Sequence, residues 1–191
     1  MFARSRLPRA ETASLRTELP GARVLAWSRI CSEEAEKRGA AAEPERTPSQ
    51  SAGRRLPAYA VATVGHLAVG RAGAWSVKAW HDIIWGGWDS DTGRLTWTDA
   101  DGAVGGAVLA EPGLLPDVFR ERVDAAVLLS ERVAQGDEAG GSAVVAAWRQ
   151  LGDPDAPPVW RVTPLDPAVP PSAATLAAAR ARLSELRREL P

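Results

Sequence analysis

The stretch from Trp75 to Trp97 contains five of the chain's eight tryptophans. A packed tryptophan side chain buries roughly 150 to 250 Å² of surface, so we expect this stretch to supply the centre of the hydrophobic core. Alternating apolar patterns flank residues 90–93, whose sequence SDTG is typical of a hairpin loop with glycine at a position of positive φ. A second turn at residues 99–102 leads to residues 103–109. The pattern therefore predicts a three-stranded antiparallel meander.

The same alternation predicts which tryptophans are buried. Ile83 and Trp85 are two residues apart, so on a regular strand both would point to one face. Trp97 would lie across from them on the next strand, and we therefore expect both Trp85 and Trp97 in the core. The two glycines at 86–87 predict a bulge or a sharp bend in this strand.

The composition restricts the class of protein. A chain of 191 residues buries a sufficient core without a metal ion or a disulfide. Its one cysteine, Cys31, cannot form an internal disulfide, and no cysteine–histidine set has metal-ligand spacing, which favours a reducing cytoplasm and no cofactor. The net charge of −1 gives no general attraction to nucleic acid. Neither a run of about 18 apolar residues nor a secretory signal pattern is found, so we expect a cytoplasmic protein without a transmembrane segment.

Two irregular segments interrupt the first half of the chain. Residues 1–21 are polar and aperiodic, and they predict a loosely ordered N-terminal arm. Residues 31–56 carry five acidic and five basic residues with almost no large apolar side chain, so they predict a mobile loop. Alternating patterns predict strands on both sides of that loop, at residues 23–30, 57–64, 67–69 and 75–78.

The second half begins with helical periodicity at residues 114–123. Residues 124–134 allow a longer helix or a switch to a strand, and we favour the strand. Residues 142–150 and 158–165 predict a β-hairpin. Residues 173–190 place alanines and leucines on one stripe, which predicts an amphipathic helix that packs on the chain's own sheet or, alternatively, on a second copy.

This order of elements resembles the pleckstrin-homology-like fold, a bent sheet or split barrel with one helix. The likeness rests on the strands of residues 23–109 and on the motif HDIIWGGWDSDTGRLTWTDADG, and it covers residues 22–125. Residues 126–191 would add a β-hairpin and the C-terminal amphipathic helix, packed on the same domain. The chain also resembles uncharacterised small proteins of high-GC actinobacteria. The expected fold class is α+β, mainly antiparallel β.

The resemblance implies a binding module, since members of this superfold present loops to lipids, peptides or partner proteins. Lipid-binding eukaryotic members carry a basic signature on the first strand pair. The basic residues near those positions in this chain are Arg29, Arg54, Arg55 and Lys78. Their spacing differs from that signature, so phosphoinositide binding is not expected.

The candidates for ligand or partner binding are Arg54, Arg55, Lys78, Trp80 and His81. His81 is followed by an aspartate, and a histidine–aspartate pair can act as a general base. Neighbours on a strand point to opposite faces, however, so we interpret this pair as structural and predict no catalytic residue. The aspartates of the two hairpin turns are interpreted as turn-forming residues rather than as a shared metal site; they are Asp89, Asp91, Asp99 and Asp101.

Three hypotheses about function follow, of which the third is a structural subunit of a larger complex with an exposed apolar patch on the last helix. The first is a non-enzymatic binding or scaffold module that contacts an unknown protein partner, as a monomer or as a weak homodimer through the C-terminal helix. The alternative is a small-ligand-binding protein or an enzyme with a tryptophan-lined pocket near His81. The alternative requires a cavity of at least about 300 Å³ that contains Trp80, His81 and an arginine.

Overall fold

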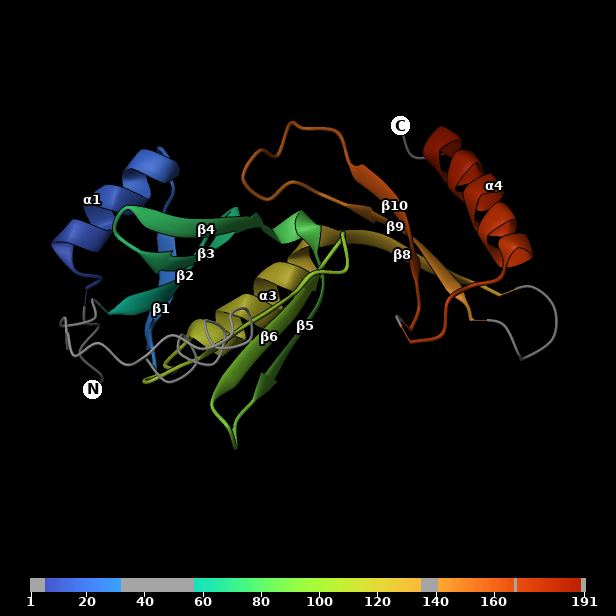
Figure 1. The fold of residues 1–191 in the computed structure, drawn as a ribbon. Helices are drawn as coiled ribbons and strands as arrows, with labels where there is room; N and C mark the ends of the chain where they lie inside the picture. The colour runs from blue at the N-terminus through green and yellow to red at the C-terminus, as the bar shows by residue number, and fades with distance from the viewer. Residues whose placement is uncertain (1–5, 32–56, 135–140, 167, 190–191) are drawn as a thin grey trace, which may run out of the picture.

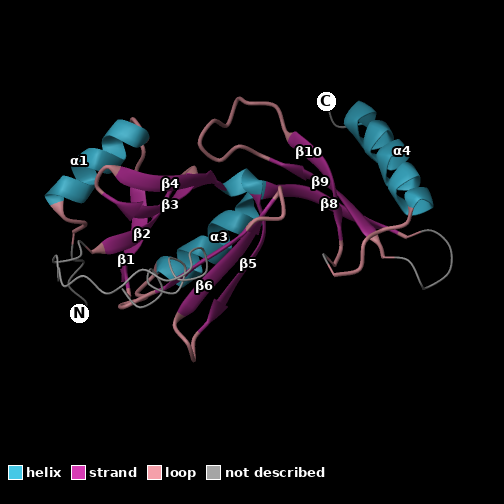
Figure 2. Ribbon diagram, in the orientation of Figure 1, coloured by secondary structure: helices cyan, strands magenta, loops and turns pink. Residues whose placement is uncertain are grey.

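The computed structural model describes residues 6–31, 57–134, 141–166 and 168–189. This part of the chain is an α+β structure, with three α-helices and ten strands arranged in three antiparallel sheets (Figures 1 and 2). The expected mobile loop at 31–56 lies outside the described residues apart from Cys31.

The first sheet has four strands in the order β1-β2-β3-β4. Its strands are β1 (Val24–Ile30), β2 (Ala58–Thr63), β3 (His66–Arg71) and β4 (Ala74–Ala79). All four patterns predicted from the alternation form strands. β1 is an edge strand of this sheet, and the chain at its C-terminal end bonds to the end of β7 (Val104–Val108), where Cys31 N donates to Val108 O.

The second sheet is the predicted meander, and the structure confirms it. A 3₁₀ turn, η1 (Trp80–Asp82), leads from the first sheet into β5 (Ile83–Asp89), which is followed by β6 (Arg94–Asp99) and β7 (Val104–Val108). Gly93 and Gly102 take φ values of 63° and 79° in the two turns, as the loop sequences predict.

Helix α3 (Leu115–Ala126) lies against both of these sheets and contacts β1, β2, η1 and β5. The ring of Phe119 meets the edge of Trp80 with 5.7 Å between ring centroids. A Cβ at Gly86 would lie 2.3 Å from the Phe119 ring, so this glycine allows the helix to approach β5. The strands form three antiparallel sheets that do not close into a barrel, which corrects the expectation of one bent sheet or split barrel.

The buried tryptophans differ in part from those predicted. Trp97 is 7% exposed and belongs to the core, but Trp85 is 58% exposed. The pairing of β5 with β6 shifts register between Ile83 and Trp85, so one extra residue places Trp85 on the face opposite to Ile83. The core residue of η1 is instead Trp80, which has no exposed surface.

The N-terminal segment is also more ordered than its composition predicts. Helix α1 (Arg9–Glu18) occupies the segment that was expected to be a loose arm. Leu7 and Leu15 are buried in a cluster with Tyr59 and Val61 of β2. These tertiary contacts stabilise a ten-residue helix, a length that is marginal for an isolated helix in water.

The third sheet has the order β10-β9-β8 and carries the C-terminal helix on one side (Figure 1). Its strands are β8 (Val127–Val133), β9 (Ala143–Trp148) and β10 (Val159–Pro164), and the helix is α4 (Ala173–Glu189). The chain changes from helix to strand after Ala126, as we favoured for residues 124–134. Ala179 and Leu186 of α4 are buried in a cluster with Val145 of β9. Among the described residues, no helix is long and apolar enough to span a bilayer.

Candidate functional site

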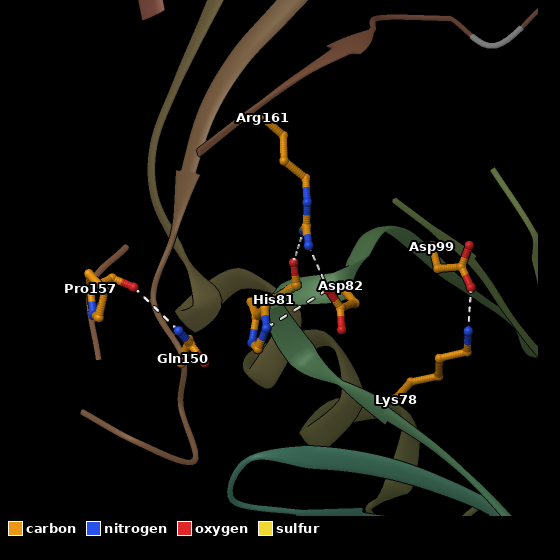
Figure 3. A network of polar contacts seen from close by, with 7 residues as sticks. All are labelled: Lys78, His81, Asp82, Asp99, Gln150, Pro157 and Arg161. Atoms are coloured by element: carbon orange, nitrogen blue, oxygen red, sulfur yellow. Dashed lines mark hydrogen bonds and ion pairs between the residues drawn. The ribbon is translucent and has the colours of Figure 1, made fainter. Parts of the chain in front are cut away.

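Lys78 is engaged in an ion pair between the first two sheets. It lies on β4, and its Nζ donates to Asp99 Oδ2 at the end of β6 over 2.5 Å (Figure 3). Asp99 is almost buried, and its other oxygen accepts the backbone N–H of Ala103. The hydrogen bond to the ammonium group lowers the pKa of Asp99 and raises the pKa of Lys78. Lys78 therefore joins two strands rather than offering an isolated positive charge.

Trp80 is a core residue with one satisfied polar group. Its Nε1 donates to the backbone oxygen of Thr63 over 3.0 Å, and the ring packs against Phe119. With no surface exposed to solvent, this indole forms part of the packing between α3 and the first sheet. Its ring is not the wall of an open pocket.

His81 and Asp82 lie on the 3₁₀ turn rather than on a strand. The turn brings His81 Nε2 within 3.8 Å of Asp82 Oδ1, which is too long for a hydrogen bond. Arg161 reaches both residues from β10: it donates to the backbone oxygen of His81 and, over 2.6 Å, to Asp82 Oδ1 (Figure 3). The guanidinium group also lies 5.7 Å from the ring centroid of Trp148, at cation–π distance. This cluster connects the third sheet to η1.

His66, at the start of β3, lies close enough to His81 and Asp82 for their charges to affect its pKa, so it belongs to this junction between the third sheet and η1. Burial lowers the pKa of His66, and the positive charge of a protonated His81 would lower it further. Burial also lowers the pKa of His81, opposed by Asp82 and aided by Arg161. Both imidazoles are therefore neutral at neutral pH. The partly buried histidines and the ion pair between Arg161 and Asp82 hold the third sheet against η1.

Two of the four hairpin aspartates, Asp89 and Asp99, hold their turns through side-chain hydrogen bonds, as the sequence predicts. Asp89 accepts backbone hydrogen bonds from Asp91 and Thr92, and Asp99 accepts one from Ala103. The hydrogen bonds from Thr92 lower the pKa of Asp89. Within the described ranges, no three residues of the histidine, cysteine and acidic types come together as a metal site.

A wide concave surface lies elsewhere, between α1, β1 and residues 111–114. This α1–β1 groove has a volume of about 1940 Å³. Apolar side chains of the groove include Leu15, Leu19 and Leu25. Five arginines also line it: Arg6, Arg9, Arg16, Arg23 and Arg29. A smaller hollow of about 250 Å³ lies between β5 and α3 and is lined by Gly86, Trp88 and Phe119, among others.

All five groove arginines are exposed. None of their guanidinium groups forms an ion pair or a hydrogen bond with another residue of the described chain. By contrast, Arg122, Arg161 and Arg182 are paired with carboxylates. Among the described residues that line the groove, Glu111 is the one carboxylate, so these residues together carry a net charge of about +4, from five arginines and one glutamate.

Sequence reasoning did not identify this groove. Arg6, Arg9 and Arg16 lie in the segment that the sequence predicts to be a loose arm, and Arg23 and Arg29 lie in the predicted first strand, so no pattern in the sequence groups the five. One signal was available, since Arg9 and Arg16 are seven residues apart and share one face of α1. The structure separates the candidates Lys78, Trp80 and His81 from the groove, and Arg54 and Arg55 lie outside the described residues.

Comparisons of the chain with protein-family models, with curated proteins and with solved structures give no match. The groove and the junction are therefore interpreted from their own geometry.

Proposed function

We propose that the protein is a non-enzymatic binding module that engages a protein partner through the α1–β1 groove. The observation that carries this proposal is the combination of an open groove of about 1940 Å³ with apolar side chains and exposed arginines that have no partner within the described chain. Protein interfaces are typically enriched in arginine and aromatic residues and combine an apolar centre with a polar rim. The groove combines arginines with apolar side chains, and the half-buried Trp27 lies on its β-sheet side.

We further propose that β1 to α3 form a pleckstrin-homology-like domain, with the third sheet and α4 as an addition. Support comes from the four strands followed by three strands and a helix, and from the position of that helix against both sheets. In this proposal α1 is an N-terminal extension that builds one wall of the groove. The resemblance to small actinobacterial proteins stays a prediction.

The alternative, a tryptophan-lined ligand pocket near His81, has less support. Trp80 is fully buried, and the main polar contacts of this region are made by Arg161 to His81 and Asp82. A ligand would have to displace Arg161, which carries two hydrogen bonds and the contact with Trp148. The groove needs no such displacement.

The proposal is tested by blocking the groove with a bulky side chain. Ala13 is exposed on α1 and lines the groove, so Ala13→Trp fills space without disturbing the core. Ala177→Trp on α4 is the matched control, because Ala177 is also an exposed helical alanine but lies away from the groove. Affinity purification from cells that produce the protein, quantified by mass spectrometry, should recover the same partner with wild type and Ala177→Trp and lose it with Ala13→Trp. Recovery of an identical set of proteins with all three would refute the proposal.

A further inference from the structure

We propose that the partner segment bound in the α1–β1 groove is acidic: a peptide stretch that combines glutamate or aspartate with apolar side chains. This inference rests on the proposed function, because it names the chemistry of the segment that the groove accepts. It is carried by the distribution of charge in the groove, by its shape and by the placement of its aromatic rings.

The charge of the groove differs from that of the whole chain. The chain has a net charge of −1, but the groove has five arginines and one glutamate. Arg9 and Arg16 lie on α1, whereas Arg23 and Arg29 lie at the two ends of β1, so positive charge borders the groove on both sides. Guanidinium groups bind carboxylates in a bidentate manner, which makes acidic side chains the complementary partners.

The apolar side chains of the groove indicate that its ligand also carries apolar groups. Leu19 and Leu25 are half-buried and line the groove together with the arginines. They retain apolar surface that a bound side chain can cover, at about 25 cal/mol per Å² of area removed from water. A simple polyanion would satisfy the arginines and leave this surface exposed.

The concave shape favours a peptide over a membrane surface. A planar bilayer contacts protruding cations, whereas these arginines surround a hollow of about 1940 Å³. A flat surface reaches the rim of such a hollow but not the leucines within it. A single peptide segment can lie along the groove and reach both.

The aromatic rings favour a peptide over single-stranded nucleic acid. Proteins that bind single strands stack the bases on exposed aromatic faces. Here Tyr59 is 6% exposed, and the half-buried Trp27 meets it edge to face with 5.8 Å between centroids. The two rings pack on each other and with the core rather than forming a stacking platform.

The test uses fluorescein-labelled synthetic peptides with the full-length protein. The probe is a peptide of alternating glutamate and leucine, and the glutamine–leucine peptide of equal length is its neutral control. Fluorescence anisotropy should detect binding of the acidic peptide that weakens as the salt concentration rises from roughly 0.05 M to roughly 0.5 M, because screening reduces the attraction between exposed charges. The neutral peptide should bind at least about tenfold more weakly, since charge complementarity selects the partner.

A matched pair of charge-reversal variants locates the site. Arg9→Glu/Arg16→Glu reverses two charges seven residues apart on α1, and Arg180→Glu/Arg187→Glu makes the same change at the same spacing on α4. All four side chains are exposed, so both variants are expected to keep the fold, which circular dichroism verifies. The first variant should lose acidic-peptide binding by at least about tenfold, and the second should retain it within about twofold. If reversal on α4 weakens binding as much as reversal on α1, the groove is not the site.

Two further probes separate the remaining outcomes. Binding of phosphatidylserine vesicles or of an oligothymidylate, without binding of the acidic peptide, would overturn the inference in favour of a membrane or a nucleic acid. Equal binding of the acidic and neutral peptides would also overturn it. If no probe binds but Ala13→Trp still loses the cellular partner, the acidic chemistry is wrong and the proposed function stands. If that partner is retained as well, both fail.

Discussion

Gly65 and Gly152 lie against each other at the junction between the first and third sheets, so close that a Cβ on Gly65 would be 2.6 Å from the Cα of Gly152. Gly65 lies in the turn between β2 and β3, and Gly152 lies in the loop between β9 and β10. The contact brings the two loops together beside His66. The third sheet is thus attached to the first part of the molecule by backbone contact as well as by Arg161.

The two glycines of this junction should respond differently to alanine. Gly65→Ala places its methyl group against backbone atoms that cannot move alone, so we expect a loss of about 1 to 3 kcal/mol in the free energy of unfolding. Gly152→Ala is the matched control, because its Cβ would meet Gly65 Cα and the His66 ring at an ordinary 3.4 Å. Urea denaturation of both variants measures the difference. Equal stabilities would show that the two loops are not in contact.

Trp80 and Trp85 should make very different contributions to stability. Trp80→Ala removes an indole that is fully buried between α3 and the first sheet, and we expect a loss of about 3 to 5 kcal/mol. Trp85→Ala removes a ring that is 58% exposed, and a change within about 1 kcal/mol is expected. Chemical denaturation monitored by circular dichroism compares them. A large loss for Trp85 and a small one for Trp80 would restore the assignment made from the alternation alone.

The histidines of the junction should make stability depend on pH. The pKa values of His66 and His81 are lowered from the ordinary value of 6.5, so the unfolded chain binds their protons more readily than the folded one. Their contribution is therefore fully present above about pH 6.5 and is lost as the pH falls through the lowered folded values. Asp82 and Arg161 are the charged groups beside them that enter this balance.

This pH dependence is measured by thermal unfolding between about pH 7.5 and about pH 5, the range in which histidine titrates. The melting temperature of wild type should fall on acidification through this range. The double variant His66→Gln/His81→Gln should show a flatter profile, because the two titrating groups are gone. Identical slopes for wild type and variant would assign the acid sensitivity to other residues.

Removal of α4 distinguishes packing within one chain from a contact between two copies. The helix covers a cluster that includes Val145 and Ala143, both without exposed surface. Truncation after Leu165 would uncover this apolar face, so the melting temperature should fall. An unchanged melting temperature together with loss of a dimer in light scattering would instead place α4 between two chains.

The elements that short-range patterns specify were predicted well. The meander, its two glycine turns and the switch from helix to strand after residue 126 all follow from alternation and turn residues that act over a few positions. The helix α1 was not predicted, because Leu7 and Leu15 are too few to form a recognisable stripe and are buried only when β2 supplies Tyr59 and Val61. Its order is a tertiary effect.

The candidate site was the least predictable feature. Residue type alone suggests three of the candidates, Lys78, Trp80 and His81. In the structure Lys78 forms an ion pair with Asp99, Trp80 is buried in the core, and His81 accepts a hydrogen bond from Arg161. The α1–β1 groove brings together arginines from residue 6 to residue 29 only after the helix has folded onto the sheet. Residue spacing along the chain carries little information about that approach.

The sequence by itself determined where this chain turns and where its strands and longer helices lie, because turn residues and local periodicity act within a few residues. The tertiary structure alone decided which faces are buried and where the groove forms. Trp85 shows the physical reason: the register shift after Ile83 adds one residue to a pattern with a period of two and turns the indole from the core to solvent.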